Sequence, residues 1–182
     1  MLYLTKVTEI LGAIDELASH PILWLDTEIA DWHTPYPRIS LIQVSVDVED
    51  LIGEKVLIFD VLDQPQLVKY FVECLMVNTQ IEKVFHNSSF DLKYLGESQA
   101  QNITCTYKLA KKITRDRLST TNLKLKTLAV ELCHFSNVDA EEGTSDWGQR
   151  PLTQKQLDYA KMDTIYLARV HVYLKKWEES NG

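Results

Sequence analysis

The stretch Ile22-Leu23-Trp24-Leu25-Asp26-Thr27-Glu28 indicates how the chain folds, because an apolar run ends in two acids. This pattern predicts a buried strand over residues 22–28. Side chains alternate across a strand, so Asp26 and Glu28 lie on one face. Two neighbouring carboxylates repel each other unless one is protonated or a cation lies between them, and Mg²⁺ prefers such oxygen ligands. A solvated strand end is the commoner explanation, so the pair alone is weak evidence for a metal site.

Two further β-rich segments follow this strand along the chain. Residues 39–46 and 55–59 have the composition of strands, and Gly53-Glu54 is typical of the turn between them. Short connections predict an antiparallel meander of three strands. A helix over residues 5–19, capped by Thr5 and ended by His20-Pro21, is predicted before the first strand.

Beyond residue 60 the predicted elements alternate between helix and strand. A helix over 65–76 precedes a strand over 81–85, and a short helix runs from Ser88 or Ser89 to Leu95. Thr153 and Gln156 form the capping-box pattern that opens the last helix. The remaining predicted segments are helices over 105–113, 122–134 and 153–177 and a loop over 135–150. The sequence therefore predicts a mixed α/β sheet covered by helices.

Composition limits the classes of protein to which the chain can belong. Its 182 residues, 45% hydrophobic and 25% charged, suit one soluble globular domain. The first residues of the sequence do not have the pattern of a secretory signal, and no apolar run is nearly long enough to span a membrane. Cys74, Cys105 and Cys133 are odd in number and far apart, so we expect reduced, buried thiols in a cytoplasmic protein with no membrane partner. The net charge of −7 argues against a general nucleic-acid binder, unless cations neutralise the acids at a site.

Two more segments contain polar and acidic residues of the kinds found in catalytic sites. In His86-Asn87-Ser88-Ser89-Phe90-Asp91 a strand ends, polar residues follow, and an acid stands in the first turns of the next predicted helix. Tyr159 and Asp163 are four residues apart on the last helix and therefore share one face. Each segment alone has an ordinary structural explanation: turn polarity and helix capping for the first, and an aromatic side chain beside a surface acid for the second.

Together, the three segments resemble the exonuclease domain of the ribonuclease D family, among the DEDD 3′–5′ exonucleases of the tyrosine subtype (DEDDy). The family pattern is D-x-E, then His-Asn-x-x-x-Asp, then Tyr-x-x-x-Asp, and the likeness spans roughly residues 20–175. The segments 37–43 and 145–152 resemble flanking parts of the family. The family's helical nucleic-acid-binding domains do not follow before Gly182, so we expect a single exonuclease domain over residues 1–182. Cys105-Thr106 also stands where many relatives have Asp-Thr.

The resemblance implies a ribonuclease H-like fold with a five-stranded mixed sheet flanked by helices, three strands being antiparallel and the others parallel. The strand that the pattern alone does not predict would lie around residues 102–105. The resemblance also implies two divalent ions, Mg²⁺ or Mn²⁺, that hydrolyse phosphodiester bonds at the 3′ end of single-stranded RNA. Their ligands would be four acids, which account for four of the seven excess negative charges: Asp26, Glu28, Asp91 and Asp163.

The remaining roles also come from the resemblance. Tyr159 would orient the attacking water, because a phenol with a pKa near 10 is a poor base at neutral pH. Substrate contacts are expected from residues in and beside the motifs: Thr27, His86, Asn87, Phe90 and Arg150. A DNA exonuclease of the same fold is an alternative, and a catalytically inactive nucleic-acid-binding module is a weaker one because the four acids and the tyrosine are intact.

A basic stretch between Tyr107 and Lys126 contains seven cations and one acid, Asp116. The cations are Lys108, Lys111, Lys112, Arg115, Arg117, Lys124 and Lys126. They could follow a nucleic-acid backbone, as in single-strand binders, or cover a solvated helix face. The sequence leaves these two explanations open.

Overall fold

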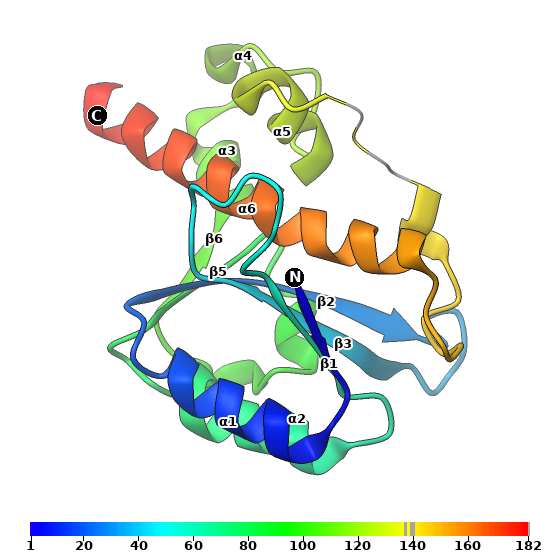
Figure 1. Ribbon diagram of the computed structural model, residues 1–182. Helices are drawn as coiled ribbons and strands as arrows, with labels where there is room; N and C mark the ends of the chain where they lie inside the picture. The colour runs from blue at the N-terminus through cyan, green and yellow to red at the C-terminus, as the bar shows by residue number, and fades with distance from the viewer. Residues whose placement is uncertain (137, 139–140, 182) are drawn as a thin grey trace.

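The computed structural model describes residues 1–136, 138 and 141–181. Its centre is one mixed sheet with strand order β1-β4-β3-β2-β5-β6, and helices cover both faces (Figure 1). The strands are β1 Leu2–Leu4, β2 Ile22–Ala30, β3 Arg38–Ser45, β4 Leu57–Asp60, β5 Glu82–Phe85 and β6 Ile103–Cys105. The predicted α/β class and mixed sheet are confirmed.

The sheet has six strands where five were expected. β2, β3 and β4 form the predicted antiparallel meander, and β5 and β6 continue parallel to β2. The short strand implied near residue 103 is present as β6. The additional strand is β1, which pairs parallel with β4 at the edge of the sheet. Its three residues are too few to show an alternating pattern, so the sequence did not predict it.

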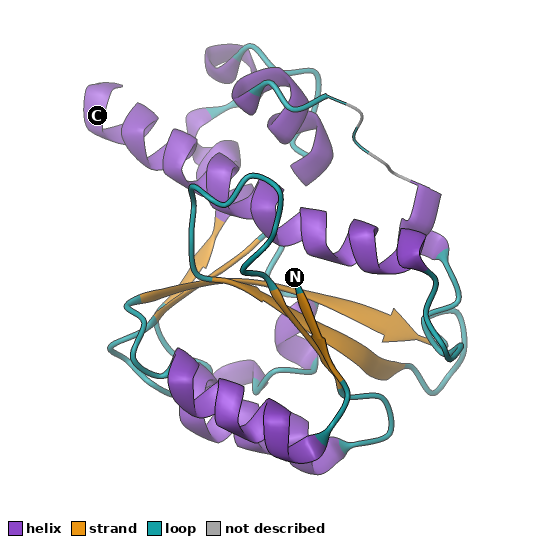
Figure 2. Cartoon of the chain, viewed as in Figure 1, coloured by secondary structure: helices purple, strands orange, loops and turns teal. Residues whose placement is uncertain are grey.

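The helices form two layers, one on each face of the sheet (Figure 2). One layer contains α1 Val7–Leu17 and α2 Pro65–Phe71, which a π-helical turn extends over Val72–Met76. The long helix α6 crosses the other face. The elements of that side are α3 Thr106–Ile113, α4 Arg115–Leu118, α5 Leu125–Cys133 and α6 Gln154–Asn181. None of the helices in the described ranges is long and apolar enough to cross a membrane.

Alternation along β2 decides where the acids point. Leu23 and Leu25 are fully buried in the core that includes residues of α1 and α2. Trp24 faces the other way and packs against Leu167 and Ala168 of α6. Asp26 follows Trp24 by two residues and therefore lies on the α6 side of the sheet. Because helices cover both faces of the sheet, nearly all side chains in the first half of β2 are apolar.

The helix predicted from Ser88 or Ser89 to Leu95 is wrong. The segment is a series of turns with short 3₁₀ helices at Asp91–Lys93 and Glu97–Gln99. Asn87 with φ 61° and Gly96 with φ 95° bound it. The segment is too short for its hydrogen bonds to offset the free energy of nucleating a regular α-helix. Its backbone hydrogen bonds join residues three apart in some places and four apart in others.

Other differences concern helix ends. Thr5 does not cap α1, because Lys6 occupies the N-cap position and no side chain caps the helix. α5 begins after residue 122, because Asn122 Oδ1 accepts the backbone N–H of Lys124 and holds a turn there. The capping box of α6 is confirmed: Thr153 Oγ1 accepts from the Gln156 N–H at 3.1 Å, and Gln156 Oε1 accepts from the Thr153 N–H at 2.9 Å.

The segment predicted as a loop over 135–150 contains a 3₁₀ helix at Glu141–Thr144. Within that loop, residues 137, 139 and 140 lie outside the described residues. α4 was not predicted, and α6 continues to Asn181 beyond its expected end at Trp177. The three cysteines are free thiols as expected, but only Cys105 is buried, whereas Cys74 and Cys133 are partly exposed.

Candidate active site

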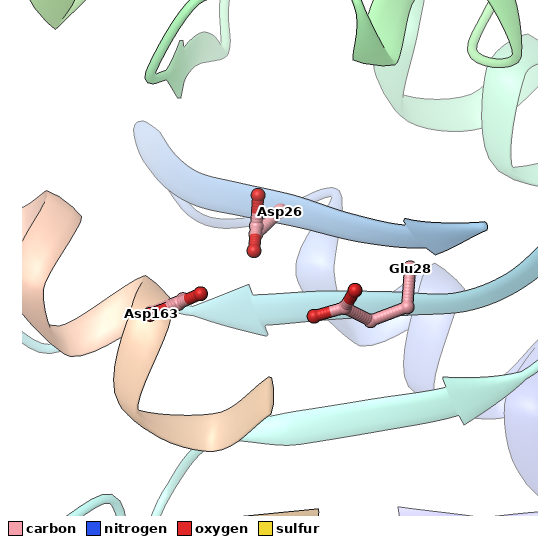
Figure 3. Close-up of side chains that lie close together, drawn as sticks. All are labelled: Asp26, Glu28 and Asp163. Carbon is pink, nitrogen blue, oxygen red and sulfur yellow. The ribbon is translucent and has the colours of Figure 1, made fainter. Parts of the chain in front are cut away.

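Three carboxylates from two elements converge on the α6 side of the sheet. Asp26 and Glu28 come from β2 and Asp163 comes from α6 (Figure 3). One oxygen of each lies within 4.8 Å of the others. Glu28 and Asp163 are buried, and Asp26 is partly exposed. The alternation of β2 and the docking of α6 together make this cluster, since neither element alone carries three acids on one face.

The electrostatics of the cluster favour a bound cation. Burial and the negative charges of Asp163 and Asp91 raise the pKa of Asp26 well above its usual value. Burial and the charges of Asp26 and Asp163 raise the pKa of Glu28 in the same way. Buried carboxylates with raised pKa values are destabilised as anions, so a cation placed among them is bound strongly.

Asp91 lies beside the three carboxylates but outside their 4.8 Å group. It is 3% exposed, and burial raises its pKa to about 7. The Thr27 hydroxyl donates to Asp91 Oδ1 at 2.7 Å. The hydroxyl hydrogen of Thr27 is therefore used to position Asp91, and a contact of Thr27 with substrate stays a prediction.

Tyr159 stands one helical turn before Asp163, with its ring packed beside Trp147 at 6.1 Å between centroids. Burial and the charges of Asp163, Glu28 and Asp26 raise the pKa of its phenol above the ordinary value. A Cβ on Gly143 would lie 2.7 Å from Tyr159 Oη, so glycine allows the 3₁₀ segment to approach the hydroxyl. With its pKa raised, the phenol keeps its proton at neutral pH.

Lys126 is a site residue that the sequence did not distinguish from its basic neighbours. Its Nζ lies 3.2 Å from Asp163 Oδ1 and 3.3 Å from the centroid of the Tyr159 ring. Its positive charge lowers the raised pKa values of Asp26 and Glu28. The contact depends on the packing of α5 against α6, for which the sequence contains no local signal.

The donor set fits divalent cations of the Mg²⁺ type. Carboxylate oxygens are the ligands that Mg²⁺ and Mn²⁺ prefer, and three are already grouped with Asp91 nearby. The single positive charge of Lys126 does not balance four acids. The cations would be held directly by Asp26, Glu28 and Asp163. Asp91 lies next to this group of three carboxylates.

A small aromatic hollow lies on the Glu28 side of the cluster, with a volume of about 290 Å³. Phe90 and Trp32 contribute exposed rings, with 43% and 53% of their surface accessible. Phe90 was predicted to contact substrate, and its position in the hollow is compatible with that prediction. Trp32 was not predicted, because a lone tryptophan in a turn has no sequence signal of its own.

His86 uses both ring nitrogens inside the protein. Nε2 lies 3.0 Å from the Leu123 carbonyl oxygen and Nδ1 lies 2.8 Å from Thr106 Oγ1. The carbonyl can only accept, so Nε2 carries the proton and Nδ1 accepts from the hydroxyl. Burial lowers the pKa of His86 to about 4, so the ring is neutral. The ring thus positions the segment around Leu123, and a contact of His86 with substrate stays a prediction.

The Arg150 guanidinium is held within the protein. Its guanidinium binds Asp60 in a bidentate ion pair, with Nε–Oδ2 at 2.6 Å and Nη2–Oδ1 at 2.7 Å. The remaining N–H groups reach Ser40 Oγ and the carbonyls of Trp147 and Gln149. All five donors are used, so Arg150 fixes the segment before α6 and has no N–H left for a phosphate.

Comparison with known proteins decides the family. The model of a 3′–5′ exonuclease domain family matches residues 3–177. The chain belongs to this family. Ribonuclease D from Bartonella henselae is 29% identical over 192 residues, which cover 100% of this chain and 42% of that protein. The resemblance to ribonuclease D is thereby confirmed, and the exonuclease-family chain spans less than half the length of this curated relative.

Solved structures share the exonuclease-family fold. Escherichia coli RNase D matches with a TM-score of 0.76 at 24% identity, over 99% of this chain and 46% of that one. Brucella melitensis NrnC with bound Mg²⁺ matches with a TM-score of 0.68 at 28% identity, over 91% of this chain and 77% of that one. The same NrnC was also solved bound to pGG.

The raised pKa values predict how stability depends on pH and metal. The pKa of Asp91 is raised above its unfolded value, so its favourable contribution is complete below about pH 4 and is lost as pH rises through about 7. Asp26 and Glu28 act in the same direction. We expect the metal-free protein to melt at a lower temperature at about pH 8 than at about pH 6, and Mg²⁺ to raise the melting temperature more at the higher pH. Thermal melts in EDTA and in excess MgCl₂ measure this, and an Mg²⁺ shift independent of pH would contradict it.

Lys126→Met should destabilise the metal-free protein and strengthen its response to metal. The substitution keeps the length of the side chain but removes the positive charge that pairs with Asp163, so the melting temperature in EDTA should fall by about 5 °C, equivalent to about 2 kcal/mol. Because no ammonium then competes for Asp163, half-saturation with Mg²⁺ should need less metal. Lys6→Met, at an exposed helix start, is the control. An unchanged melt in EDTA would show that the ion pair contributes nothing.

Proposed function

We propose that this exonuclease-family chain is a metal-dependent 3′–5′ exoribonuclease. It hydrolyses the last phosphodiester bond of single-stranded RNA and releases nucleoside 5′-monophosphates, including in the trimming of tRNA or other structured RNA 3′ ends. The observation that carries this proposal is the convergence of Asp26, Glu28 and Asp163 within 4.8 Å, beside Tyr159, in a chain of the 3′–5′ exonuclease family.

The acids have separate roles in this proposal. Asp26, Glu28 and Asp163 would hold the divalent cations through their carboxylate oxygens, and Asp91 would support them through water. When bound, the two divalent ions activate the water and stabilise charge on the leaving 3′-oxygen. The water oxygen would form the new bond to phosphorus as one of its protons passes to solvent. The bond from phosphorus to the 3′-oxygen of the penultimate nucleotide would break as that oxygen takes up a proton.

Tyr159 orients the water in this proposal. Its protonated phenol stands over the cluster and is held by Trp147 and by the close approach of Gly143. The raised pKa of the Tyr159 phenol keeps it protonated, so almost no phenolate is present to act as a general base. The hydroxyl therefore accelerates attack mainly by orienting the water.

The aromatic hollow is the proposed place of the terminal nucleotide. Its volume of about 290 Å³ admits one nucleoside, and Phe90 and Trp32 offer ring faces or edges to a base. Stacking of this kind tolerates any base, as an exonuclease that shortens varied sequences requires.

The test is a digest of 5′-labelled RNA with Mg²⁺ or Mn²⁺, beside a matched DNA. The proposal expects a ladder of progressively shorter labelled RNA products, and no ladder from Asp26→Ala. Equal or faster shortening of the DNA would favour the DNA exonuclease instead. Absence of any product on several 3′-ended substrates would overturn the enzyme assignment and favour an inactive binding module.

A further inference from the structure

A second and larger hollow lies beside the carboxylates, with a volume of about 770 Å³. We call it the basic pocket. It is lined by His86, Asn87, Tyr107, Lys111, Thr114, Arg115, Asn122, Leu123, Lys124 and Leu125. Ligand sites of this volume accommodate molecules of more than one nucleotide, so its size alone suits a short oligomer.

Three cations at the basic pocket have no acidic partner. Lys111, Arg115 and Lys124 are exposed, and no acid within the described residues forms an ion pair with them. Other members of the basic stretch do have partners. Lys112 forms an ion pair with Glu178, and Lys126 forms one with Asp163. The Arg117 guanidinium lies over the ring of Trp177. Apart from Lys108, which neither lines the pocket nor forms an ion pair within the described residues, the structure separates cations that contact α6 from cations that surround an open pocket.

Local backbone geometry places these cations around the pocket. Thr114, at the junction of α3 and α4, has φ 84°, a conformation that costs a β-branched residue energy. The break puts Lys111 at the end of one helix and Arg115 at the start of the next. On the far wall, His86 holds the Leu123 carbonyl, so the segment that carries Lys124 stays at the rim.

The pocket also has groups for the non-ionic parts of a nucleotide. Tyr107 is 37% exposed and packs edge-on against His86, with centroids 5.9 Å apart. Asn87 supplies an amide on the same wall. The N-terminus of α5 opens here through Leu125, and no side chain caps it. Cations, aromatic rings and free helix N–H groups are the combination that binds single-stranded nucleic acid.

Both hollows adjoin elements that carry the carboxylates, and they share no lining residue. Leu125 lines the basic pocket, and the next residue, Lys126, contacts Asp163. Trp24 of β2 pairs with Val84 of β5, so Asp26 and His86, each two residues on, are neighbours where β5 ends and β2 continues. Glu28, farther along β2, lines the aromatic hollow.

We propose that the basic pocket binds the phosphates and one or two bases of the nucleotides upstream of the cleaved bond, in an RNA strand whose 3′ end lies at the carboxylates. This inference rests on the proposed function. It also accounts for the charge of the chain: a protein of net charge −7 repels a polyanion, and unpaired cations concentrated beside the site offset that repulsion locally.

Binding measurements test the pocket without catalysis. The probe is a 5′-fluorescein-labelled RNA of about eight nucleotides, titrated in Ca²⁺ at several salt concentrations. In Lys111→Ala/Arg115→Ala/Lys124→Ala, the slope of log affinity against log salt should decrease by about 2, since each phosphate contact on a single strand contributes about 0.7. Lys124→Ala alone should lose about a third of that. A triple-variant slope equal to the wild-type slope would overturn the proposal.

The matched control removes the same charge elsewhere. Lys6, Lys55 and Lys69 are exposed and lie outside the pocket lining, so their triple alanine variant should keep the wild-type slope apart from a small general effect. An equal decrease of the slope in this control would assign the effect to net charge and would also overturn the proposal. Melting temperatures of both triple variants check that the fold is retained.

Substrate length separates this proposal from the proposed function. A dinucleotide without a 5′-phosphate has no phosphate upstream of its cleaved bond, so the pocket variant should cleave it within about twofold of wild type. Its kcat/KM on the eight-nucleotide RNA should fall about a hundredfold, mainly through KM. Equal losses on both substrates would overturn the pocket assignment. If wild type cleaves neither substrate, the proposed function fails, and the salt slopes still decide whether the pocket binds RNA.

Discussion

Asp163→Asn is expected to lower turnover of a 3′-ended RNA by about a thousandfold or more, equivalent to about 4 kcal/mol of transition-state stabilisation. Asp163 is 7% exposed and shares the 4.8 Å group with Asp26 and Glu28. The amide keeps the shape of the side chain but loses the charge and one of the oxygens with which it can hold a cation. Single-turnover kinetics in saturating Mg²⁺ measure the loss.

The same substitution should have an opposite effect on metal-free stability. Removing one of several mutually repelling anions favours the fold, so the melting temperature of Asp163→Asn in EDTA should not fall, and its rise with added Mg²⁺ should be smaller than for wild type. Asp158→Asn is the control, because Asp158 is a half-exposed acid earlier on the same helix. Turnover of Asp163→Asn at the wild-type rate would remove Asp163 from the site.

Tyr159→Phe is expected to lower kcat about a hundredfold while metal affinity and RNA affinity stay near wild type. The ring keeps its packing against Trp147, and only the hydroxyl beside Gly143 is lost. A group that orients an attacking water contributes a factor of this size. The measurements are kcat, Mg²⁺ half-saturation, and RNA binding in Ca²⁺.

A matched control for this variant lies on the same helix. Tyr173→Phe removes a phenol from the packing beside α5 and should leave kcat unchanged. A Tyr159→Phe enzyme with full kcat would show that the hydroxyl does not orient the water. A variant with unchanged kcat but weakened metal binding would show instead that the hydroxyl supports the ligands.

Local sequence patterns predicted much of the fold because their causes are local. The period-two alternation of β2 put Asp26 and Glu28 on one face, and the structure has both on the α6 side. The capping box at Thr153 and Gln156 is present with both of its hydrogen bonds. Predictions failed where a segment was too short for a pattern, as at β1 and at the turns after Asn87.

The sequence determines the role of a side chain less closely than it determines its position. Thr27, His86 and Arg150 were predicted to contact substrate, and in the structure their side chains bind Asp91, Leu123 and Asp60. A polar residue beside a motif has the same appearance in sequence whether it contacts substrate or holds the site together. The difference depends on which donors and acceptors the rest of the chain brings near it.

The order and spacing of the D-x-E, His-Asn-x-x-x-Asp and Tyr-x-x-x-Asp segments identified the family and the candidate acids by themselves, since each depends on residues close together in the chain. Only the tertiary structure decided that Lys126 contacts Asp163, that Trp32 and Phe90 share a hollow, and that Lys111, Arg115 and Lys124 surround a pocket. Those contacts join elements distant in sequence, and their geometry comes from how helices dock on the sheet, which no local periodicity encodes.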